Sequence, residues 1–195
     1  MQDSKLQMIA DQNLDILFHF YISKSKFCLT IISQRQFIKQ NKKINYFQPI
    51  FLSNRDGLNG FNFRSKVKGR SNLLMIFKSK SGNIFGEYTP CKWNYNLNSY
   101  VQDDTLSSFL FSQTHDEIYP LKLQSKAQAI YCNSTCGPTF GGGHDLYIGS
   151  DFQGGSSNFG HSYWCEDQYF AKNTHLFGQS TPNIEECEIF EVLFV

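Results

Sequence analysis

The sequence predicts a mainly β protein with short flanking helices (α+β), built as a two-sheet antiparallel β sandwich. At 195 residues the chain is long enough for one domain with its own core. Its 19 Phe and 10 Tyr recur in short runs between Gly, Asn and Ser, which is typical of strands bounded by turns. From Leu73 onward these runs follow one another without a helix-length pattern, and this excludes βαβ repeats in favour of a sandwich.

The segment before Leu73 is predicted to be largely helical. Apolar side chains recur at helical spacing near the N-terminus, and Ser33 is a suitable N-cap for the helix that follows it. Further on, Phe61 or Phe63 is expected to face inward from a short helix. The expected elements are a helix over residues 4–22, a helix over Gln34–Lys42, a strand over Ile50–Leu52, a turn over Asn54–Gly57 and a helix over residues 60–69.

The remainder of the chain is predicted to consist of strands and turns. Leu73–Phe77 and Ile84–Tyr88 form a hairpin through the turn Lys80–Asn83, because two apolar runs flank a Ser-Gly-Asn sequence. Further strands are expected over residues 106–112, 117–123, 127–133, 145–151, 156–164, 175–179 and 187–195.

The charge balance and the N-terminal stretch limit the classes of function. Eighteen basic and seventeen acidic residues leave the chain nearly neutral, so neither nucleic acid nor an anionic membrane is expected as a partner. The first 22 residues contain Asp3, Asp11 and Asp15 and no small-residue cleavage site, unlike a secretory signal. No run approaches the roughly 18 apolar residues of a membrane helix. We therefore expect a cytoplasmic monomer whose six cysteines are reduced thiols.

The glycine run in PTFGGGHDLYIGSD (residues 138–151) has two interpretations. A phosphate-binding loop needs G-x-G-x-x-G or G-x-x-x-x-G-K-[ST] between a strand and a helix, whose N-terminal amides bind the phosphate. Here Gly141, Gly142 and Gly143 precede a strand-like alternation, and no Lys-Ser/Thr pair follows. The alternative, a turn or close backbone crossing that needs glycine, fits better.

Catalytic chemistry would have to combine residues from separate segments. His144 and Asp145 are adjacent, so in a strand their side chains point to opposite faces and do not form a dyad. A nucleophile could come from Cys132, Cys136 or Ser162, since triads assemble in space. However, there is no G-x-S-x-G elbow and no family-type cysteine signature, and histidines beside turns are usually structural.

A metal site is the other specific alternative. Cys132, Cys136, His144, His161 and Cys165 are soft ligands within a short segment. Structural zinc prefers two paired knuckles, and the second pair here is irregular. A buried cytosolic cysteine more often fills apolar space. The enzyme hypothesis, a thiol-dependent peroxide scavenger or a metal-assisted hydrolase, therefore rests on Cys132, Cys136, His144 and His161.

The C-terminal segment NIEECEIFEVLFV is acidic. If it is a strand, Glu186 and Glu188 share one face while Cys187 and Ile189 share the other. The exposed face is then either simply solvated or a docking surface for a basic partner.

Four blocks of the sequence together resemble the TLDc domain family. SNRDGLNGFNFRSKVKG (residues 53–69) is similar to the family's S-R-D-G-F…F-H-x-K-C-D-G, and LLMIFKSKSGNIFGEYTPCKW (73–93) to its G-x-V-F-G-G-Y hairpin and following tryptophan. GPTFGGGHDLYI (137–148) is similar to G-P-x-F-G-G-G-x-D-L, and ECEIFEV (186–192) to the terminal strand. We expect residues 31–195 to form the TLDc-like domain and residues 1–30 a helical extension.

The chain departs from the family pattern at three positions. Arg64 and Val67 stand where the family has the histidine and cysteine of F-H-x-K-C, which argues against redox chemistry in that block. Glu87 replaces the second glycine of the G-G-Y step, and a slightly different turn is expected there.

The resemblance implies a β sandwich that docks proteins and has no catalytic residues and no cofactor. TLDc proteins are associated with oxidative-stress resistance and with binding the vacuolar proton-pumping ATPase (V-ATPase), so its subunits are the expected partner and the surface of acidic organelles a possible location. The expected contact residues are Arg55, Asp56, His144, Asp145, Glu186 and Glu188, while Gly141, Gly142 and Gly143 shape the turn.

Overall fold

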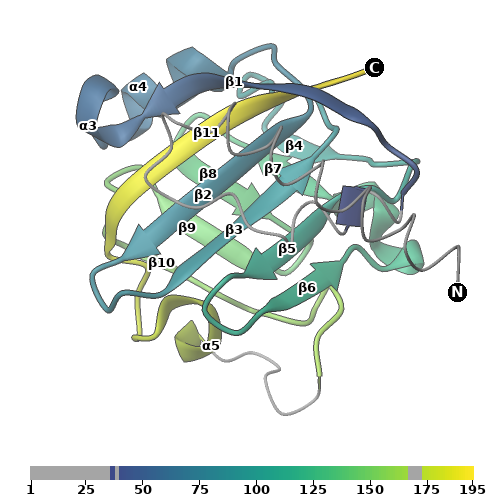
Figure 1. The fold of residues 1–195 in the computed structure, drawn as a ribbon. Helices are drawn as coiled ribbons and strands as arrows, with labels where there is room; N and C mark the ends of the chain where they lie inside the picture. The colour runs from purple at the N-terminus through teal and green to yellow at the C-terminus, as the bar shows by residue number, and fades with distance from the viewer. Residues whose placement is uncertain (1–35, 38–39, 167–172) are drawn as a thin grey trace, which may run out of the picture.

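The computed structural model describes residues 36–37, 40–166 and 173–195 and shows two antiparallel sheets packed face to face (Figure 1). The mainly β class and the sandwich are confirmed. In the described part of the chain, one sheet has six strands in the order β1 (Ile44–Leu52), β11 (Ile184–Phe194), β2 (Leu73–Ser79), β3 (Ile84–Thr89), β5 (Phe109–Ser112) and β6 (Glu117–Pro120). The other has five, in the order β10 (Gly155–Ser156), β9 (Leu146–Gly149), β8 (Cys136–Phe140), β7 (Ile130–Cys132) and β4 (Ser99–Val101).

The six-stranded sheet joins distant parts of the sequence. β11 lies between β1 and β2, with Val192 opposite Phe47 and Cys187 opposite Phe77. The predicted hairpin of β2 and β3 is confirmed, with Phe77 opposite Phe85. Because β11 bonds to both neighbours, the early and late parts of the chain form one hydrogen-bonded layer.

Two apolar clusters stabilise this sheet from its two faces. The inter-sheet core is aromatic, and Phe63 lies among four other rings at centroid distances of 5.8–6.5 Å. A second buried cluster lies on the other face of the six-stranded sheet and includes Phe47, Tyr88, Phe109 and Phe190. Residues on both faces of β2 are buried, which is why its sequence LLMIF is continuously apolar rather than alternating.

Short helices close the ends of the sandwich. α3 (Ser53–Asp56) and α4 (Gly60–Val67) follow β1, the 3-10 helix η1 (Leu123–Gln128) precedes β7, and α5 (Asn173–Phe177) precedes β11. Asn59 caps α4 by accepting a hydrogen bond from the Asn62 amide at 2.9 Å. Phe63, rather than Phe61, faces inward.

Several element boundaries differ from the prediction. The strand expected over Ile50–Leu52 begins at Ile44, and the turn expected at Asn54–Gly57 is the helical turn α3 with Gly57 after it. Residues 117–123 form β6 and then leave the sheet for η1, and β4 and β8 were not predicted as strands. The helix expected over residues 4–22 lies outside the described residues, as does the extension over residues 1–30, while only Gln36 and Phe37 of the helix expected over Gln34–Lys42 are described as helical.

Two predicted strands are wrong, for reasons visible in the structure. Residues 175–179 contain the end of α5, where Gly178 has φ of +67° and its amide donates to the Thr174 carbonyl, as at a helix C-terminus. Residues 156–164 are mostly irregular, because amides in this segment donate to the side chain of Asp145 instead of to a neighbouring strand.

Candidate functional site

The glycine run forms the loop of the β8–β9 hairpin. Phe140 pairs with Leu146, so residues 141–145 connect adjacent strands and are not a crossing between sheets. Gly141 has φ of +81° and accepts a hydrogen bond from the His144 amide at 3.1 Å. A side chain at Gly141 would collide with the Asp145 carboxylate. The interpretation of this run as a backbone turn that requires glycine is thus supported, whereas its description as a crossing needs this correction.

Asp145 is the internal anchor of this loop. Its carboxylate is fully buried and accepts hydrogen bonds from the amides of Gly160 (3.0 Å), Ser162 (2.8–2.9 Å) and Tyr163 (3.0 Å). Burial raises the pKa of this carboxyl above its ordinary value, and the amide hydrogen bonds oppose that rise. With no exposed area, Asp145 stabilises the loop from inside the protein and does not reach the surface.

His144 lies on the outer side of the same loop. It is half-buried at φ of +58°, and its ring lies 5.6 Å from that of Tyr131 and 5.7 Å from that of Tyr147. Partial burial lowers the pKa of its imidazole. His144 is therefore available at the surface, unlike its sequence neighbour Asp145.

The thiols and the hydroxyl considered for catalysis are poorly placed for it. Burial raises the pKa of Cys132, and it raises that of Cys91 to about 11, so both favour the unreactive thiol form. Ser162 is buried, and its Oγ accepts a hydrogen bond from the Gly142 amide at 2.8 Å. His161 is exposed, with Nδ1 3.4 Å from that Oγ. Cys136 is half-buried at the start of β8.

Among the residues that the structure describes, no three His, Cys, Asp or Glu side chains are grouped so that they could hold a metal ion. Cys132, Cys136, His144 and His161, the four residues of the enzyme hypothesis, are thus not brought together as a ligand set.

Arg55 and Asp56 form a charged cluster at the end of β1. Arg55 Nη2 lies 2.6 Å from Asp56 Oδ2, and Lys66 Nζ lies 3.4 Å from Oδ1. Asp56 also accepts a hydrogen bond from the Leu52 amide at 2.9 Å, which fixes the chain as it leaves the sheet. The hydrogen bond from Arg55 is the largest cause that lowers the pKa of Asp56 to about 2. The Asp56 side chain is nevertheless only 10% exposed, so Arg55 is the more accessible of the two.

The acidic strand β11 is less exposed than expected. Cys187 and Ile189 lie in the inter-sheet core, as predicted, and Glu188 is on the opposite face. Glu188 is only 6% exposed, however, because the outer face of this sheet is itself covered. Glu186 is half-buried and lies 3.2 Å from Lys78 Nζ, which also contacts Glu185 at 3.1 Å. An acidic surface on β11 is thus limited to its N-terminal end.

Sequence reasoning missed a paired histidine cluster beside α5. The rings of His115 and His175 stack with centroids 4.6 Å apart. His175 Nε2 lies 2.7 Å from the hydroxyl of Tyr119, which in turn donates to Glu117 at 2.6 Å. Burial, followed by the neighbouring His115, lowers the pKa of His175. The two histidines are 60 positions apart, so no local sequence pattern connects them.

Glu87 is a second site that was interpreted incorrectly. It was expected to alter a turn, but it lies inside β3, opposite Met75 and Leu110, and is fully buried. Burial raises its pKa well above the ordinary value, so the folded protein holds it as a neutral carboxylic acid. A carboxylate within the apolar run IFGEY was the available sequence signal.

The comparison with known families agrees with this geometry. A family model described as the TLDc domain matches residues 22–193, nearly the whole chain. The protein therefore belongs to the TLDc domain family, whose members are generally non-catalytic. A search of curated proteins gave no match. In the part of the chain that the structure describes, no helix is long and apolar enough to cross a membrane.

Proposed function

We propose that this protein is a non-catalytic docking domain that binds subunits of the vacuolar proton-pumping ATPase, modulates that pump, and in this way contributes to resistance to oxidative stress. The observation that carries the proposal is the TLDc match over residues 22–193. Under this proposal the protein acts in the cytoplasm, at the surface of acidic organelles.

The positions of the candidate residues support docking over catalysis. Asp145 and Ser162 are buried within the β8–β9 loop region, and the buried thiol of Cys132 has a raised pKa. Arg55 and His144 keep accessible surface on rigid supports, the α3 turn and the hairpin loop. A surface that is already ordered before binding loses little conformational entropy on contact with a partner.

A docking domain can modulate a pump without chemistry of its own. If it binds one assembly state of the pump more tightly than another, the equilibrium between the two states shifts by that difference in affinity. Whether the result is activation or disassembly depends on which state exposes the complementary surface.

The proposal is tested by a pull-down from vesicle membranes with the purified protein. Arg55→Glu and Glu186→Lys alter accessible members of the expected contact set, and Lys126→Glu is a matched control in η1, where Lys126 pairs with Asp104 at 3.0 Å. We expect pump subunits with the wild type and the control, and a clear loss with at least one of the other variants. Absence of pump subunits from the wild-type eluate would refute the proposal.

A further inference from the structure

The charge of this nearly neutral protein is separated in space. Residues 53–70 hold five basic side chains and one acidic one, a net charge of +4. Since the whole chain has 18 basic and 17 acidic residues, the remainder has 13 and 16, a net charge of −3. An overall charge of +1 thus conceals one basic segment on an otherwise acidic protein.

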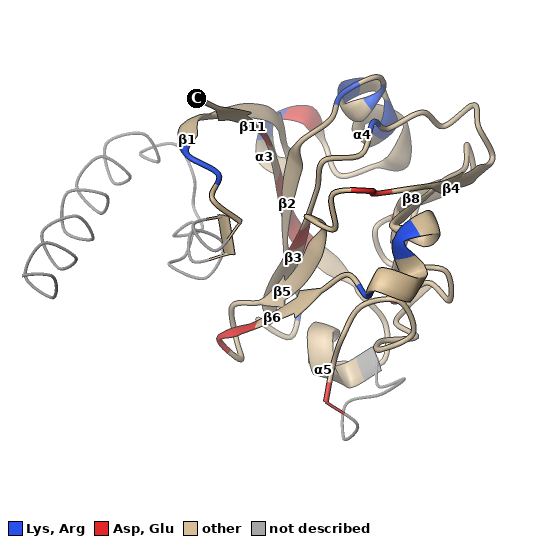
Figure 2. Cartoon of the chain, turned by 90° about the vertical axis from the view of Figure 1, so that its right-hand side faces the viewer, with Lys and Arg blue, Asp and Glu red and all other residues tan. Residues whose placement is uncertain are grey.

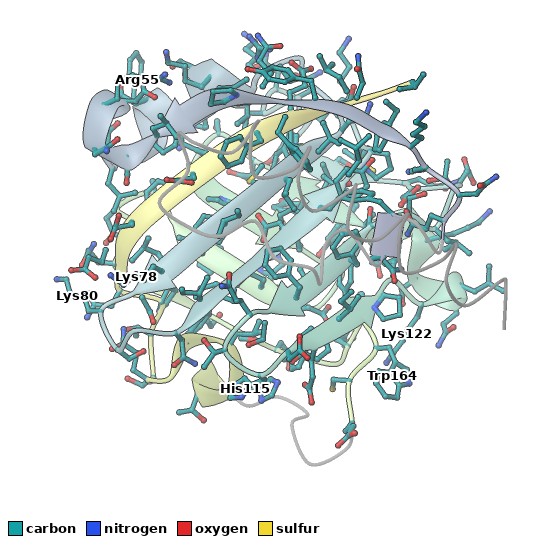
Figure 3. The ribbon with its side chains drawn as sticks, viewed as in Figure 1. Arg55, Lys78, Lys80, His115, Lys122 and Trp164 are labelled. Atoms are coloured by element: carbon teal, nitrogen blue, oxygen red, sulfur yellow. The ribbon has the colours of Figure 1, made fainter. Side chains whose placement is uncertain are left out.

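This basic segment forms the α3–α4 face, which we define by Arg55, Phe61, Lys66 and Lys68. The two helices lie together at one end of the sandwich, beside the end of β1 (Figure 1). Figure 2 shows Lys and Arg on α4, and Figure 3 shows Arg55 at the edge of this end, far from Lys80 at the β2–β3 turn.

The helix pattern explains why these side chains face outward. Gly60, Phe63 and Val67 are the buried residues of α4, so Phe61 lies on the other side and is 76% exposed. Lys66 and Lys68 are exposed as well. A large aromatic side chain surrounded by cations offers apolar contact area within a positively charged surface.

Nearby carboxylates leave much of this positive charge uncompensated. Asp56 is shared by Arg55 and Lys66, and Arg70 pairs with Glu191 at 2.6 Å. Arg64 donates to a neutral acceptor, the Cys136 carbonyl, at 3.0 Å. Five cations against Asp56 and Glu191 leave a net charge of +3 at this end of the protein.

The face is also held rigidly. The Gly60 amide donates to the Ser150 carbonyl at 2.7 Å, and a side chain at Gly60 would collide with Ser150, so α4 lies directly against the end of β9. Arg64 connects the helix to β8, and Phe63 fixes it in the aromatic core. The cations and Phe61 are therefore presented in a fixed arrangement before any partner binds.

We propose that the α3–α4 face docks an acidic segment of a partner protein, with carboxylates opposite Arg55, Lys66 and Lys68 and an apolar side chain packed on Phe61. The charge complementarity identifies the chemistry of the partner. Lipid headgroups are a poorer match, because stable recruitment to anionic membranes uses clusters of roughly four to eight Lys/Arg, more than this face leaves uncompensated. The inference rests on the proposed function and specifies the surface that serves it.

Binding is measured by fluorescence anisotropy with a short fluorescein-labelled peptide of Glu and Leu, against the same peptide with Gln in place of Glu. For the wild type we expect at least about tenfold tighter binding of the Glu peptide, weakening as salt is added. Lys68→Glu should weaken it by about tenfold and Phe61→Ser by about fivefold. Lys80→Glu, an exposed lysine elsewhere, should change nothing.

Equal affinity for the two peptides, or unchanged binding by Lys68→Glu and Phe61→Ser, would overturn the inference. So would tighter binding to phosphatidylserine vesicles than to the peptide, since the face would then serve a membrane. Thermal unfolding of each variant verifies folding, and Lys68 and Phe61 both point away from the core, so their replacement should leave the fold intact.

The pump pull-down separates this inference from the proposed function. If Lys68→Glu and Phe61→Ser recover pump subunits as well as the wild type does, the surface is wrong and the docking function stands. If the wild type recovers no pump subunits yet binds the Glu peptide through Lys68, the surface stands and the assignment of the pump is wrong.

Discussion

The buried carboxyl of Glu87 should make the protein less stable as the pH rises. Glu87 is fully buried in β3, and neither carboxyl oxygen has a hydrogen-bond partner. Burial raises the folded-state pKa well above the ordinary 4.5, so the folded protein keeps a proton that the unfolded chain releases. The stability associated with the neutral form is therefore complete below about pH 4.5 and is lost as pH rises toward the folded-state pKa.

The size of the effect follows from proton linkage. Each pH unit between the two pKa values removes about 1.4 kcal/mol from the free energy of unfolding. Glu87→Gln is neutral in both states and should remove this slope. Glu87→Met should remove it as well, and should also be more stable than Glu87→Gln by about 1–3 kcal/mol, because it leaves no unpaired polar group in the core.

Urea denaturation of the three proteins, repeated from about pH 5 to about pH 7, measures both effects. The difference between wild type and Glu87→Gln isolates this residue, because all other titrating groups are common to both proteins. A difference that stays constant over this range would refute the reasoning, since it would mean that Glu87 is solvated or hydrogen-bonded in the folded protein.

Three further predictions concern the loop, α5 and the thiols. Asp145→Asn and Gly141→Ala should each lower the free energy of unfolding by about 2–4 kcal/mol, because the first weakens the acceptor for three amides and the second adds a Cβ at positive φ against Asp145; urea denaturation measures both, and a loss below about 0.5 kcal/mol would contradict this. Because the folded-state pKa of His175 is lowered, its stabilisation is present above its ordinary value of 6.5 and lost as the pH falls below it; His175→Gln should flatten that loss in pH-dependent thermal unfolding, and parallel curves would exclude it. In native protein an alkylating reagent should modify half-buried Cys136 but not buried Cys187, as peptide mass spectrometry would show; early labelling of Cys187 would contradict its burial.

The parts of the fold that sequence predicted well are those where the local pattern and the tertiary environment agree. The β2–β3 hairpin combines two apolar runs with a Gly-Asn turn, and the hairpin formed as expected. α5 shows the opposite case. His-Leu-Phe is compatible with strand or helix, and only Gly178 at positive φ marks it as the end of a helix.

The candidate site divides in the same way. The requirement for glycine at Gly141 was readable, since three consecutive glycines indicate backbone constraint. The burial of Asp145 was not, because its partners are amides of residues 160–163, brought there by the fold. Glu188 shows a related limit. Alternation placed it correctly on the outer face of β11, but alternation cannot reveal that this face is covered by a second apolar cluster.

The position of β11 between β1 and β2 has a consequence for how the protein is made. Residues 184–194 leave the ribosome after every other strand that the structure describes, so β1 and β2 must wait for their shared neighbour with unpaired edges. The contact joining Phe47 to Val192 spans most of the chain, and such non-local pairing slows folding. During synthesis the nascent chain thus exposes an aromatic half-sheet, and we expect its folding to depend on chaperone protection until the last strand arrives.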